Sequence, residues 1–374
     1  MRIAIDIRKI NEFGVGSYIW NLVRNIGAVD TVNEYFLIGS EKNYQELGSL
    51  PANFSHFRRE ATSRWRDQMV LPIALMNLKP DVVHVTHHET PIVVPSKLVV
   101  TIHDCVHILF PPENASRFHN YRQYKQTKRV VNRAAQVIAV SNSTRDDIIN
   151  IFRVDPSKVT VIHNALDNRF RQSEEEDAAQ VLERYQLKDP FILYSGRIRP
   201  HKNVDRLIEA FAVLKSELGD NGPLGNLKLI IIGDELSQHQ YLRLTVVRSG
   251  VQQDVRFFGF VPYSTLRVFY QTAALFAFPS LYEGFGLPPL EAMANRTAVL
   301  ASNTSSLPEV LEDAAMLVNP ENLFEIARGM KLILQDQTVR QKLIEKGTRQ
   351  VTRFSWEQAA KNVVATYQKV GDRE

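Results

Sequence analysis

Two glutamates eight residues apart flank a turn that is rich in glycine and proline. Glu283 and Glu291 lie in the stretch PSLYEGFGLPPLEAMA (279–294), with Gly284 and Gly286 between them. Glycine permits turn conformations that other residues avoid, and proline suits the first turn of a helix. The segment therefore predicts a turn that leads into a helix N-terminus, where backbone N–H groups favour an anion such as a phosphate.

The predicted phosphate ligands are the backbone amides of Gly284, Phe285, Gly286 and Leu287. Two carboxylates beside a phosphate make sense if they accept hydrogen bonds from sugar hydroxyls on either side of a diphosphate. A nucleotide sugar has this layout of ribose, diphosphate and sugar. Taken alone, the spacing leaves a structural interpretation equally open, in which Glu283 caps a turn and Glu291 balances the helix dipole.

A basic motif supports the nucleotide-sugar interpretation. In YSGRIRPHKNVDRLIEAF (194–211), Arg197 follows a predicted strand, and Lys202 and Asn203 open the next helix. The ends of parallel strands meet at one edge of a sheet, so we expect these residues near the 284–287 turn, where Asn203 is predicted to bind the donor. Two cations and oriented amides can neutralise a diphosphate leaving group without a metal ion. The alternative is that these basic residues are solvated in an exposed turn.

The elements that must position these residues follow an alternating pattern. Short β-branched runs alternate with amphipathic stretches, as in parallel sheets that helices cover on both faces. The chain has 374 residues, more than one core usually supports, so two domains are expected. In the first half, strands are predicted at 2–7, 34–39, 82–86, 97–104, 134–141 and 158–164, and helices at 16–27, 64–77 and 142–151.

The polar, acidic segment 165–189 predicts the junction between the domains. The predicted fold class is α/β, with two doubly wound, Rossmann-like domains (1–170 and 185–353) whose strand ends face across a cleft. In the second domain, strands are predicted at 191–196, 227–234, 254–260, 274–280, 298–302 and 314–319, and helices at 203–218, 238–249, 263–272, 287–295 and 322–335.

The motifs EGFGLPPLE and GRIRPHKN, together with TIHD (101–104) at a strand end, resemble the retaining GT-B glycosyltransferases of family four. The resemblance covers nearly the whole chain. It implies that Glu283 binds the hydroxyls of the transferred sugar, that Glu291 binds the nucleotide ribose, and that Arg197 and Lys202 hold the diphosphate. It also implies a final helix at 354–370 that crosses back to the first domain.

Two further loops belong to the first domain. EFGVGSYIWNL contains Gly14 and Gly16 but has Ile19 where the dinucleotide fingerprint has its third glycine, so a plain strand–helix turn stays open. The resemblance implies that this loop contributes amides to a phosphate or to the acceptor. It also implies that His103 corresponds to the family's histidine near the sugar hydroxyls, while Asp104 orients it or meets the acceptor.

The sequence does not favour a metal site. The other histidines near these loops fall on different predicted strand ends and loops, no cysteine pair accompanies them, and the chain lacks an Asp-X-Asp triad. We therefore expect acceptor recognition or packing there, and no metal or cofactor. The single cysteine, Cys105, excludes an internal disulfide and is expected to be a small buried apolar residue. These histidines are His84, His87, His88 and His107.

The net charge of +4 is concentrated in the segment 115–136, which has six Lys and Arg, no Asp or Glu, and three aromatic residues. The segment is a solvated helix face or a surface for anionic lipid or an anionic acceptor. Nucleic acid is not expected, because no recognised binding motif accompanies it. The chain lacks a signal-peptide pattern and an apolar run of roughly 18 residues. A cytoplasmic protein is expected, peripheral to the inner face of the membrane if the segment binds lipid.

The predicted function is a metal-independent, retaining transfer of a sugar from a nucleoside-diphosphate sugar to a hydroxyl of a saccharide or lipid-linked saccharide. Such a reaction belongs to the assembly of surface polysaccharides or glycolipids. Two alternatives stay open: a nucleotide-sugar epimerase of the same fold, and a non-catalytic partner subunit. The segment GFVP (259–262) is expected to line the base pocket, and the donor base and sugar are left open.

Overall fold

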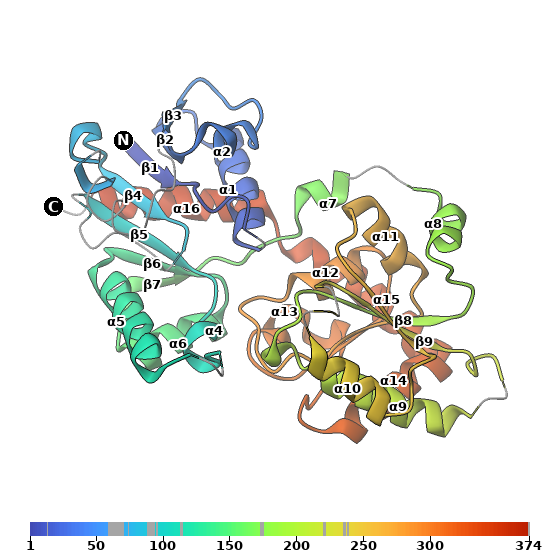
Figure 1. Cartoon of the computed structure of the whole chain (residues 1–374). Helices are drawn as coiled ribbons and strands as arrows, with labels where there is room; N and C mark the ends of the chain where they lie inside the picture. Colours follow the sequence, from blue (N-terminus) through green and yellow to red (C-terminus); the bar gives the residue numbers. More distant parts are fainter. Residues whose placement is uncertain are drawn as a thin grey trace. The chain divides into compact units, whose positions relative to one another are not determined.

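The computed structural model has two compact units (Figure 1). The first comprises Met1–Asp167 with Phe354–Glu374, and the second comprises Asn168–Arg353. The first boundary between the units, after Asp167, lies within the polar segment 165–189 that predicts the junction. The last helix of the chain belongs to the first unit. The structure describes residues 1–12, 14–58, 71–73, 75–87, 94, 96–112, 115–172, 176–219, 222–234, 237 and 239–372.

The first unit contains a parallel sheet of seven strands. Its strands are β1 (Arg2–Asp6), β2 (Glu34–Gly39), β3 (Phe54–Arg58), β4 (Val82–Val85), β5 (Lys97–Ile102), β6 (Gln136–Ala139) and β7 (Val159–Val161). Their order is β3-β2-β1-β4-β5-β6-β7, so the direction of winding reverses between β1 and β4. β3 was not predicted from the sequence, because this short edge strand is mostly polar, with two phenylalanines, and is only partly buried.

Helices cover both faces of this sheet. They are α1 (Val15–Val29), α2 (Glu41–Gln45), α4 (Val106–Leu109), α5 (Arg117–Arg133), α6 (Asn142–Phe152) and α16 (Trp356–Gly371), with a 3₁₀ turn η1 (Pro156–Lys158) before β7. Most of the helix predicted at 64–77 lies outside the described residues, as does His88, although 71–73 and 75–78 are helical.

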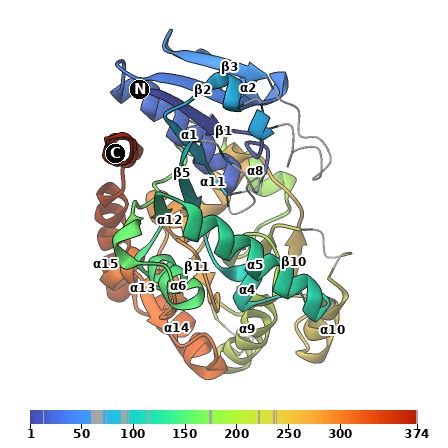
Figure 2. The same ribbon diagram turned by 90° about the vertical axis from the view of Figure 1, so that its left-hand side faces the viewer.

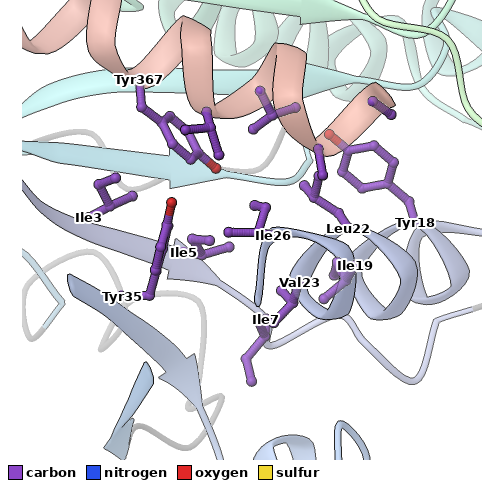
Figure 3. Close-up of a cluster of buried hydrophobic side chains, with 14 of the residues drawn as sticks. Ile3, Ile5, Ile7, Tyr18, Ile19, Leu22, Val23, Ile26, Tyr35 and Tyr367 are labelled. Atoms are coloured by element: carbon purple, nitrogen blue, oxygen red, sulfur yellow. The ribbon is translucent and has the colours of Figure 1, made fainter. Parts of the chain in front are cut away.

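The alternation of side chains along β1 creates two hydrophobic clusters, one on each face of the sheet. Ile3 and Ile5 point to the face that α1 and α16 cover, where Tyr367 of α16 packs (Figure 3). Ala4 points to the other face, where α5 and α6 pack. Because α16 supplies much of the first cluster, the C-terminal segment is part of the core of this unit.

The second unit contains a parallel sheet of six strands. They are β8 (Phe191–Ser195), β9 (Lys228–Ile232), β10 (Val255–Phe258), β11 (Leu275–Phe278), β12 (Val299–Ser302) and β13 (Met316–Val318). The order is β10-β9-β8-β11-β12-β13, which places the reversal between β8 and β11. All six strands were predicted, since each is a short, mainly apolar run; β8, β9, β11 and β12 are almost fully buried, while β10 and β13 are partly buried.

Helices again lie on both sides of the sheet. They are α7 (Asn168–Gln172), α8 (Ala178–Arg184), α9 (Val204–Leu218), α10 (Gln240–Arg248), α11 (Tyr263–Thr272), α12 (Leu287–Ala294), α13 (Leu307–Leu311), α14 (Leu323–Gln335) and α15 (Gln337–Gln350), with 3₁₀ turns η2 (Pro200–Lys202), η4 (Glu312–Ala314) and η5 (Val351–Arg353). Figure 2 shows α14 beside α9, and α12 packs against α15. No helix in the described ranges is long and apolar enough to cross a bilayer.

Candidate functional site

The candidate site of the second unit lies where β8 and β11 are neighbours in the sheet. Parallel sheets bind ligands outside the carboxyl ends of the strands, at the point where the strand order reverses. The loop after β8 carries Arg197, Lys202 and Asn203, and the loop after β11 carries Glu283 and the 284–287 turn. The topology therefore brings together the two motifs that the sequence analysis selected.

Lys202 and Glu283 form an ion pair at this point. Lys202 Nζ donates to Glu283 Oε1 at 2.6 Å and to Oε2 at 2.7 Å. The side chain of Glu283 is 9% exposed and that of Lys202 is 18% exposed, and Nζ lies 5.6 Å from the centroid of the Phe278 ring. The sequence analysis assigned these residues to different parts of the ligand and did not predict the pair, because spacing along the chain gives no distance between side chains.

Asn203 holds the two loops together. It adopts the left-handed conformation with φ 59°, and its buried amide group donates to the carbonyl oxygens of Pro279 at 3.0 Å and Pro320 at 2.8 Å. The backbone of Leu281 also donates to the carbonyl oxygen of His201 at 2.8 Å. The side-chain amide of Asn203, predicted to bind the donor, is thus engaged in positioning the loop after β11.

The loop after β12 supports the turn between Glu283 and α12. Glu283 N–H donates to Ser305 Oγ at 2.9 Å, and Ser306 Oγ donates to the Glu283 carbonyl oxygen at 3.0 Å. Gly286 has φ +100°, and a Cβ there would lie 2.6 Å from Leu307 Cδ2. Glycine is therefore required at this position for both its backbone angle and its close packing.

The N-terminus of α12 has fewer N–H groups than an ordinary helix. Gly286 and Leu287 keep theirs, but Pro288 and Pro289 have none. An anion at this helix end would therefore meet a small, fixed set of donors from the turn and from the first helical residue.

Glu291 is positioned by a buried tyrosine. Tyr270 of α11 donates its hydroxyl hydrogen to Glu291 Oε2 at 2.9 Å. Burial, followed by the charge of Glu291, raises the pKa of Tyr270 well above its ordinary value, so the hydroxyl stays protonated and remains a donor. Ser195, the last residue of β8, also hydrogen-bonds Tyr270. Glu291 is therefore connected to the end of the same strand that leads to Arg197.

The loop that carries Arg197 is fixed by its backbone. Tyr194 donates to the Arg197 carbonyl oxygen at 3.4 Å, and Ile198 N–H donates to Asp234 Oδ2 at 3.0 Å. Arg199 Nη1 lies 3.4 Å from the same oxygen. The side chain of Arg197 is exposed. Asp234 follows β9 and was not selected from the sequence. Only its contacts with Ile198 and Arg199, which are distant in sequence, reveal that it holds this loop.

In the first unit, His103 follows β5 and has a defined tautomer. Its Nε2 lies 2.9 Å from the carbonyl oxygen of Thr86, which can only accept, so Nε2 carries the hydrogen. Burial lowers the pKa of His103 and outweighs the Thr86 bond and the charge of Asp104, which raise it. Nδ1 of the neutral ring is therefore an acceptor. Asp104 Oδ1 accepts from Val106 N–H at 3.0 Å, at the start of α4.

The remaining histidines of the first unit have separate surroundings. His84 Nδ1 lies 2.6 Å from the Tyr367 hydroxyl, and Nε2 lies 2.8 Å from Thr101 Oγ1. Burial, followed by the charge of His103, lowers the pKa of His84 to about 3. His107 Nε2 lies 3.0 Å from Thr127 Oγ1. Within the described part of the chain, no three His, Cys, Asp or Glu side chains form a group that could hold a metal ion.

A buried charged cluster lies where β1 and β4 are neighbours. Arg8 donates to Asp6 through Nε at 2.9 Å and through Nη2 at 2.7 Å, and His87 Nε2 lies 3.6 Å from Asp6 Oδ2. Burial opposes ionisation of Asp6, but the charge of Arg8, the nearby His87 ring and the hydrogen bonds from Arg8 outweigh it, so the pKa of Asp6 lies far below its ordinary value. Sequence reasoning did not select this cluster, because an Asp-X-Arg sequence carries no signal of its own.

The two glycines of the first loop have structural explanations. Gly14 has φ +81° at the N-terminus of α1. A Cβ at Gly16 would lie 2.0 Å from the Ile10 carbonyl oxygen. Both positions therefore need glycine whether or not a ligand binds there.

Cys105 and the 259–262 segment occupy contrasting places. Cys105 lies in the hydrophobic cluster on the α5 side of the first sheet, and burial raises the pKa of its thiol. It therefore packs as an apolar residue, as predicted.

In the second unit, Phe260 follows β10 and is 84% exposed, so an aromatic ring stands at the sheet edge where the base pocket was predicted.

Comparison with protein families assigns both parts of the chain. Residues 176–350 match the family described as "Glycosyl transferases group 1", and residues 14–170 match "Glycosyltransferase Family 4". The two matches together extend over both compact units.

The curated relatives include bacterial mannosyltransferases. One is the "Serotype-specific mannosyltransferase WbdA" of Escherichia coli, 30% identical over 91% of this chain and 43% of the relative. Another is the "O-antigen chain mannosyltransferase B" of Escherichia coli, 30% identical over 72% of this chain and 70% of the relative. The chain spans about two fifths of the length of the first of these relatives.

A solved structure has the same fold along the whole chain. Anabaena HepE, determined in complex with UDP and glucose, has a TM-score of 0.76 and 19% identity, covering 99% of this chain and all of HepE. At this identity the similarity establishes the architecture of two Rossmann-like domains.

Proposed function

This chain belongs to glycosyltransferase family 4 and has the GT-B fold, and we propose that it transfers a sugar from a nucleoside-diphosphate sugar to an acceptor hydroxyl. The anomeric configuration is retained and no metal ion takes part. The acceptor is a saccharide or lipid-linked saccharide in the assembly of a surface polysaccharide or glycolipid, on the cytoplasmic side of a membrane.

The observation that carries this proposal is the arrangement around the Lys202–Glu283 pair. A cation, two carboxylates and a helix N-terminus converge on the ends of two adjacent strands. Glu283 has lone pairs left for sugar hydroxyls after both its oxygens accept from Lys202, because each carboxylate oxygen accepts more than one hydrogen bond. Glu291, oriented by Tyr270, accepts from the ribose.

Lys202 and the amides of Gly286 and Leu287 stabilise the departing diphosphate. As the bond between the anomeric carbon and the phosphate oxygen breaks, negative charge grows on that oxygen, and fixed donors meet it without reorganisation. Arg197 adds a second cation from the loop after β8. Asn203 acts indirectly, by holding the loop after β11.

The bond to the acceptor forms on the face that the leaving group departs from. The acceptor oxygen bonds to the anomeric carbon, and its proton passes to the departing phosphate oxygen. A two-carboxylate glycosidase mechanism needs both acids beside the reacting carbon, whereas we assign Glu291 to the ribose. This front-face route follows the family resemblance.

For the first unit, we propose that His103 accepts a hydrogen bond from a substrate hydroxyl through Nδ1. Its Nε2 hydrogen is engaged by Thr86, and the lowered pKa keeps the ring neutral near pH 7. His103 thus acts as an acceptor that orients a hydroxyl. Gly14 before α1 and Gly16 in its first turn allow the backbone there to approach a phosphate or the acceptor.

Mannose is the transferred sugar that we test first, because the named relatives are mannosyltransferases. A thermal-shift screen of nucleoside-diphosphate sugars selects the donor, and a transfer assay with the best donor and candidate saccharide acceptors measures product. We expect a new glycosidic bond with the anomeric configuration of the donor. Inverted product, or no product with any donor that binds, would refute the proposal.

The same assay separates the two alternatives. An epimerase would convert the donor into an isomeric nucleotide sugar without any acceptor, and a non-catalytic partner subunit would turn over no donor. We also expect EDTA to leave the transfer rate unchanged. Loss of activity that one divalent ion restores would contradict the metal-independent mechanism.

A further inference from the structure

The outer surface of α5 carries aromatic and basic side chains. Phe118 and Tyr121 are 76% and 56% exposed, and Arg122, Lys125 and Arg129 are exposed beside them. Their spacing of three or four residues places them along one side of the helix. We name these five side chains the α5 basic-aromatic surface.

The opposite side of α5 attaches the helix to the first unit. Thr127, Val130 and Val131 are buried, and the Tyr124 ring stacks on Phe152 of α6, with centroids 5.7 Å apart. In Figure 1, α5 lies beside α6, away from the face of the sheet that α16 covers. The α5 basic-aromatic surface thus points away from the core, and the fold does not require its side chains.

Within the described part of the chain, no acidic side chain neutralises the charges of this surface. Arg122, Lys125 and Arg129 form no ion pair among the residues that the structure describes, and the segment 115–136 contains no Asp or Glu. Some helical lysines elsewhere in the chain do have acidic partners. Examples are Lys331 with Glu217 and Lys361 with Glu357.

We propose that the α5 basic-aromatic surface docks the protein on an anionic lipid bilayer. Cations near such a membrane gain from its surface potential, while aromatic rings bury at the boundary between headgroups and acyl chains. The helix is roughly 25 Å long at 1.5 Å per residue, so it can lie flat on the surface. Phe118 favours lipid as this partner, because its exposed apolar ring gains free energy when it leaves water for the boundary of the acyl chains. The proposal does not depend on the transfer reaction.

The experiment is vesicle co-sedimentation of the full chain. Vesicles of phosphatidylcholine alone are compared with vesicles that also contain phosphatidylglycerol, at low and high ionic strength. We expect binding only to the anionic vesicles, and weaker binding at high ionic strength because salt screens the cations. Equal binding to both vesicles, or to neither, would overturn the proposal.

A charge variant tests the basic part of the surface. The triple variant Arg122→Gln/Lys125→Gln/Arg129→Gln should lose about 100-fold in partition coefficient, because each cation contributes separately near the membrane. The control Arg328→Gln/Lys342→Gln/Arg349→Gln removes the same types of charge from exposed positions of the second unit and should bind like the wild type. An equal loss in both variants would show that net charge, and not this surface, causes binding.

An aromatic variant tests the apolar part. Phe118→Ser should lose about tenfold in partition coefficient, because the ring no longer enters the lipid boundary. The control is Phe324→Ser, since Phe324 is 69% exposed and is also the second residue of its helix, α14. If the wild-type protein is retained on an anionic polysaccharide such as heparin but does not bind anionic vesicles, the partner of this surface is a soluble polyanion and the lipid proposal is wrong.

Discussion

Both sheets place a cation and a carboxylate at the point where the strand order reverses, but the two pairs differ in burial. In the first unit, the side chain of Asp6 is 1% exposed and that of Arg8 is 10% exposed, and Asp6 accepts one backbone and two side-chain hydrogen bonds from Arg8. In the second unit, the side chain of Glu283 is 9% exposed and that of Lys202 is 18% exposed, so each partner is more exposed than its counterpart in the first unit. A ligand can therefore reach the second pair more easily than the first.

The difference shows that topology alone does not identify a functional site. Asp6 and Arg8 pair with each other inside the protein, and His87 lies beside them, so we expect this cluster to act on the fold. The Lys202–Glu283 pair lies beside a helix N-terminus and a second carboxylate. A ligand can therefore replace some of the hydrogen bonds between Lys202 and Glu283. We expect the first pair to control stability and the second to control activity.

The largest expected effect is on activity in the second unit. Lys202→Ala and Glu283→Ala should each lower kcat/KM by about 10³-fold, because a fixed donor or sugar ligand is lost in the transition state. The double variant should be little worse than either, since the residues act as a pair. Initial rates measure the loss, and circular dichroism confirms folding.

The control for this pair is another ion pair of the second unit. Lys346 pairs with Asp313, and Lys346→Ala should keep wild-type kcat/KM. Wild-type rates in well-folded Lys202→Ala or Glu283→Ala would remove that residue from the site.

The next largest effect is on stability in the first unit. Asp6→Ala should lower the free energy of unfolding by about 3–5 kcal/mol, because it removes the carboxylate that pairs with the largely buried Arg8 side chain. Denaturant unfolding measures it. Asp146→Ala, which breaks an exposed pair with Arg145, should cost less than about 0.5 kcal/mol. Unchanged stability with lost activity in Asp6→Ala would mean that the first cluster is itself a ligand site.

Acidification should also act on the first unit. His84 has a pKa of about 3 in the folded chain against about 6.5 in the unfolded chain. Between these values only the unfolded chain binds the proton, so stability falls as the pH is lowered from 6.5. At pH 5 the loss from this residue is roughly 2 kcal/mol.

Denaturant unfolding at several pH values measures this dependence. The His84→Gln variant should be less stable at neutral pH but lose less stability between pH 7 and 5. His119→Gln, at an exposed position of α5, should keep the wild-type slope. An unchanged slope in His84→Gln would show that other groups cause the acid sensitivity.

The smallest effect concerns the positioning of Glu291. Tyr270→Phe removes the hydroxyl that donates to Oε2, and the Kd of the nucleoside diphosphate should rise roughly tenfold, as for the loss of one hydrogen bond to a charged group. Isothermal titration measures the affinity. Tyr185→Phe in the same unit is the control. An equal rise in Kd for that variant would show that Tyr270 has no specific role in positioning Glu291.

Sequence patterning predicted the strands and loops of the second unit because buried parallel strands are short apolar runs with glycine, proline and charged residues at their ends. It therefore selected Lys202, Glu283 and Glu291 correctly as neighbours of one sheet edge. It could not predict that Lys202 meets Glu283, or that Tyr270 meets Glu291, because such contacts depend on side-chain positions that spacing does not contain.

Other features lay beyond sequence reasoning for different reasons. Asn203 has the residue type of a ligand-binding side chain, yet its amide holds two loop carbonyls. The proline pair after Leu287 was interpreted as a helix start, which is correct, but the same prolines reduce the amides available to an anion. The Asp6–Arg8 pair resembles any charged pair at a strand end until its burial is known.

The central claim is that the second unit holds the diphosphate at the strand reversal between β8 and β11. A crystal structure of the chain with a bound nucleoside diphosphate tests it most directly. We predict a phosphate oxygen within hydrogen-bonding distance of Lys202 Nζ and of the Leu287 N–H, and the ribose on Glu291. A diphosphate bound away from these three residues would contradict the account.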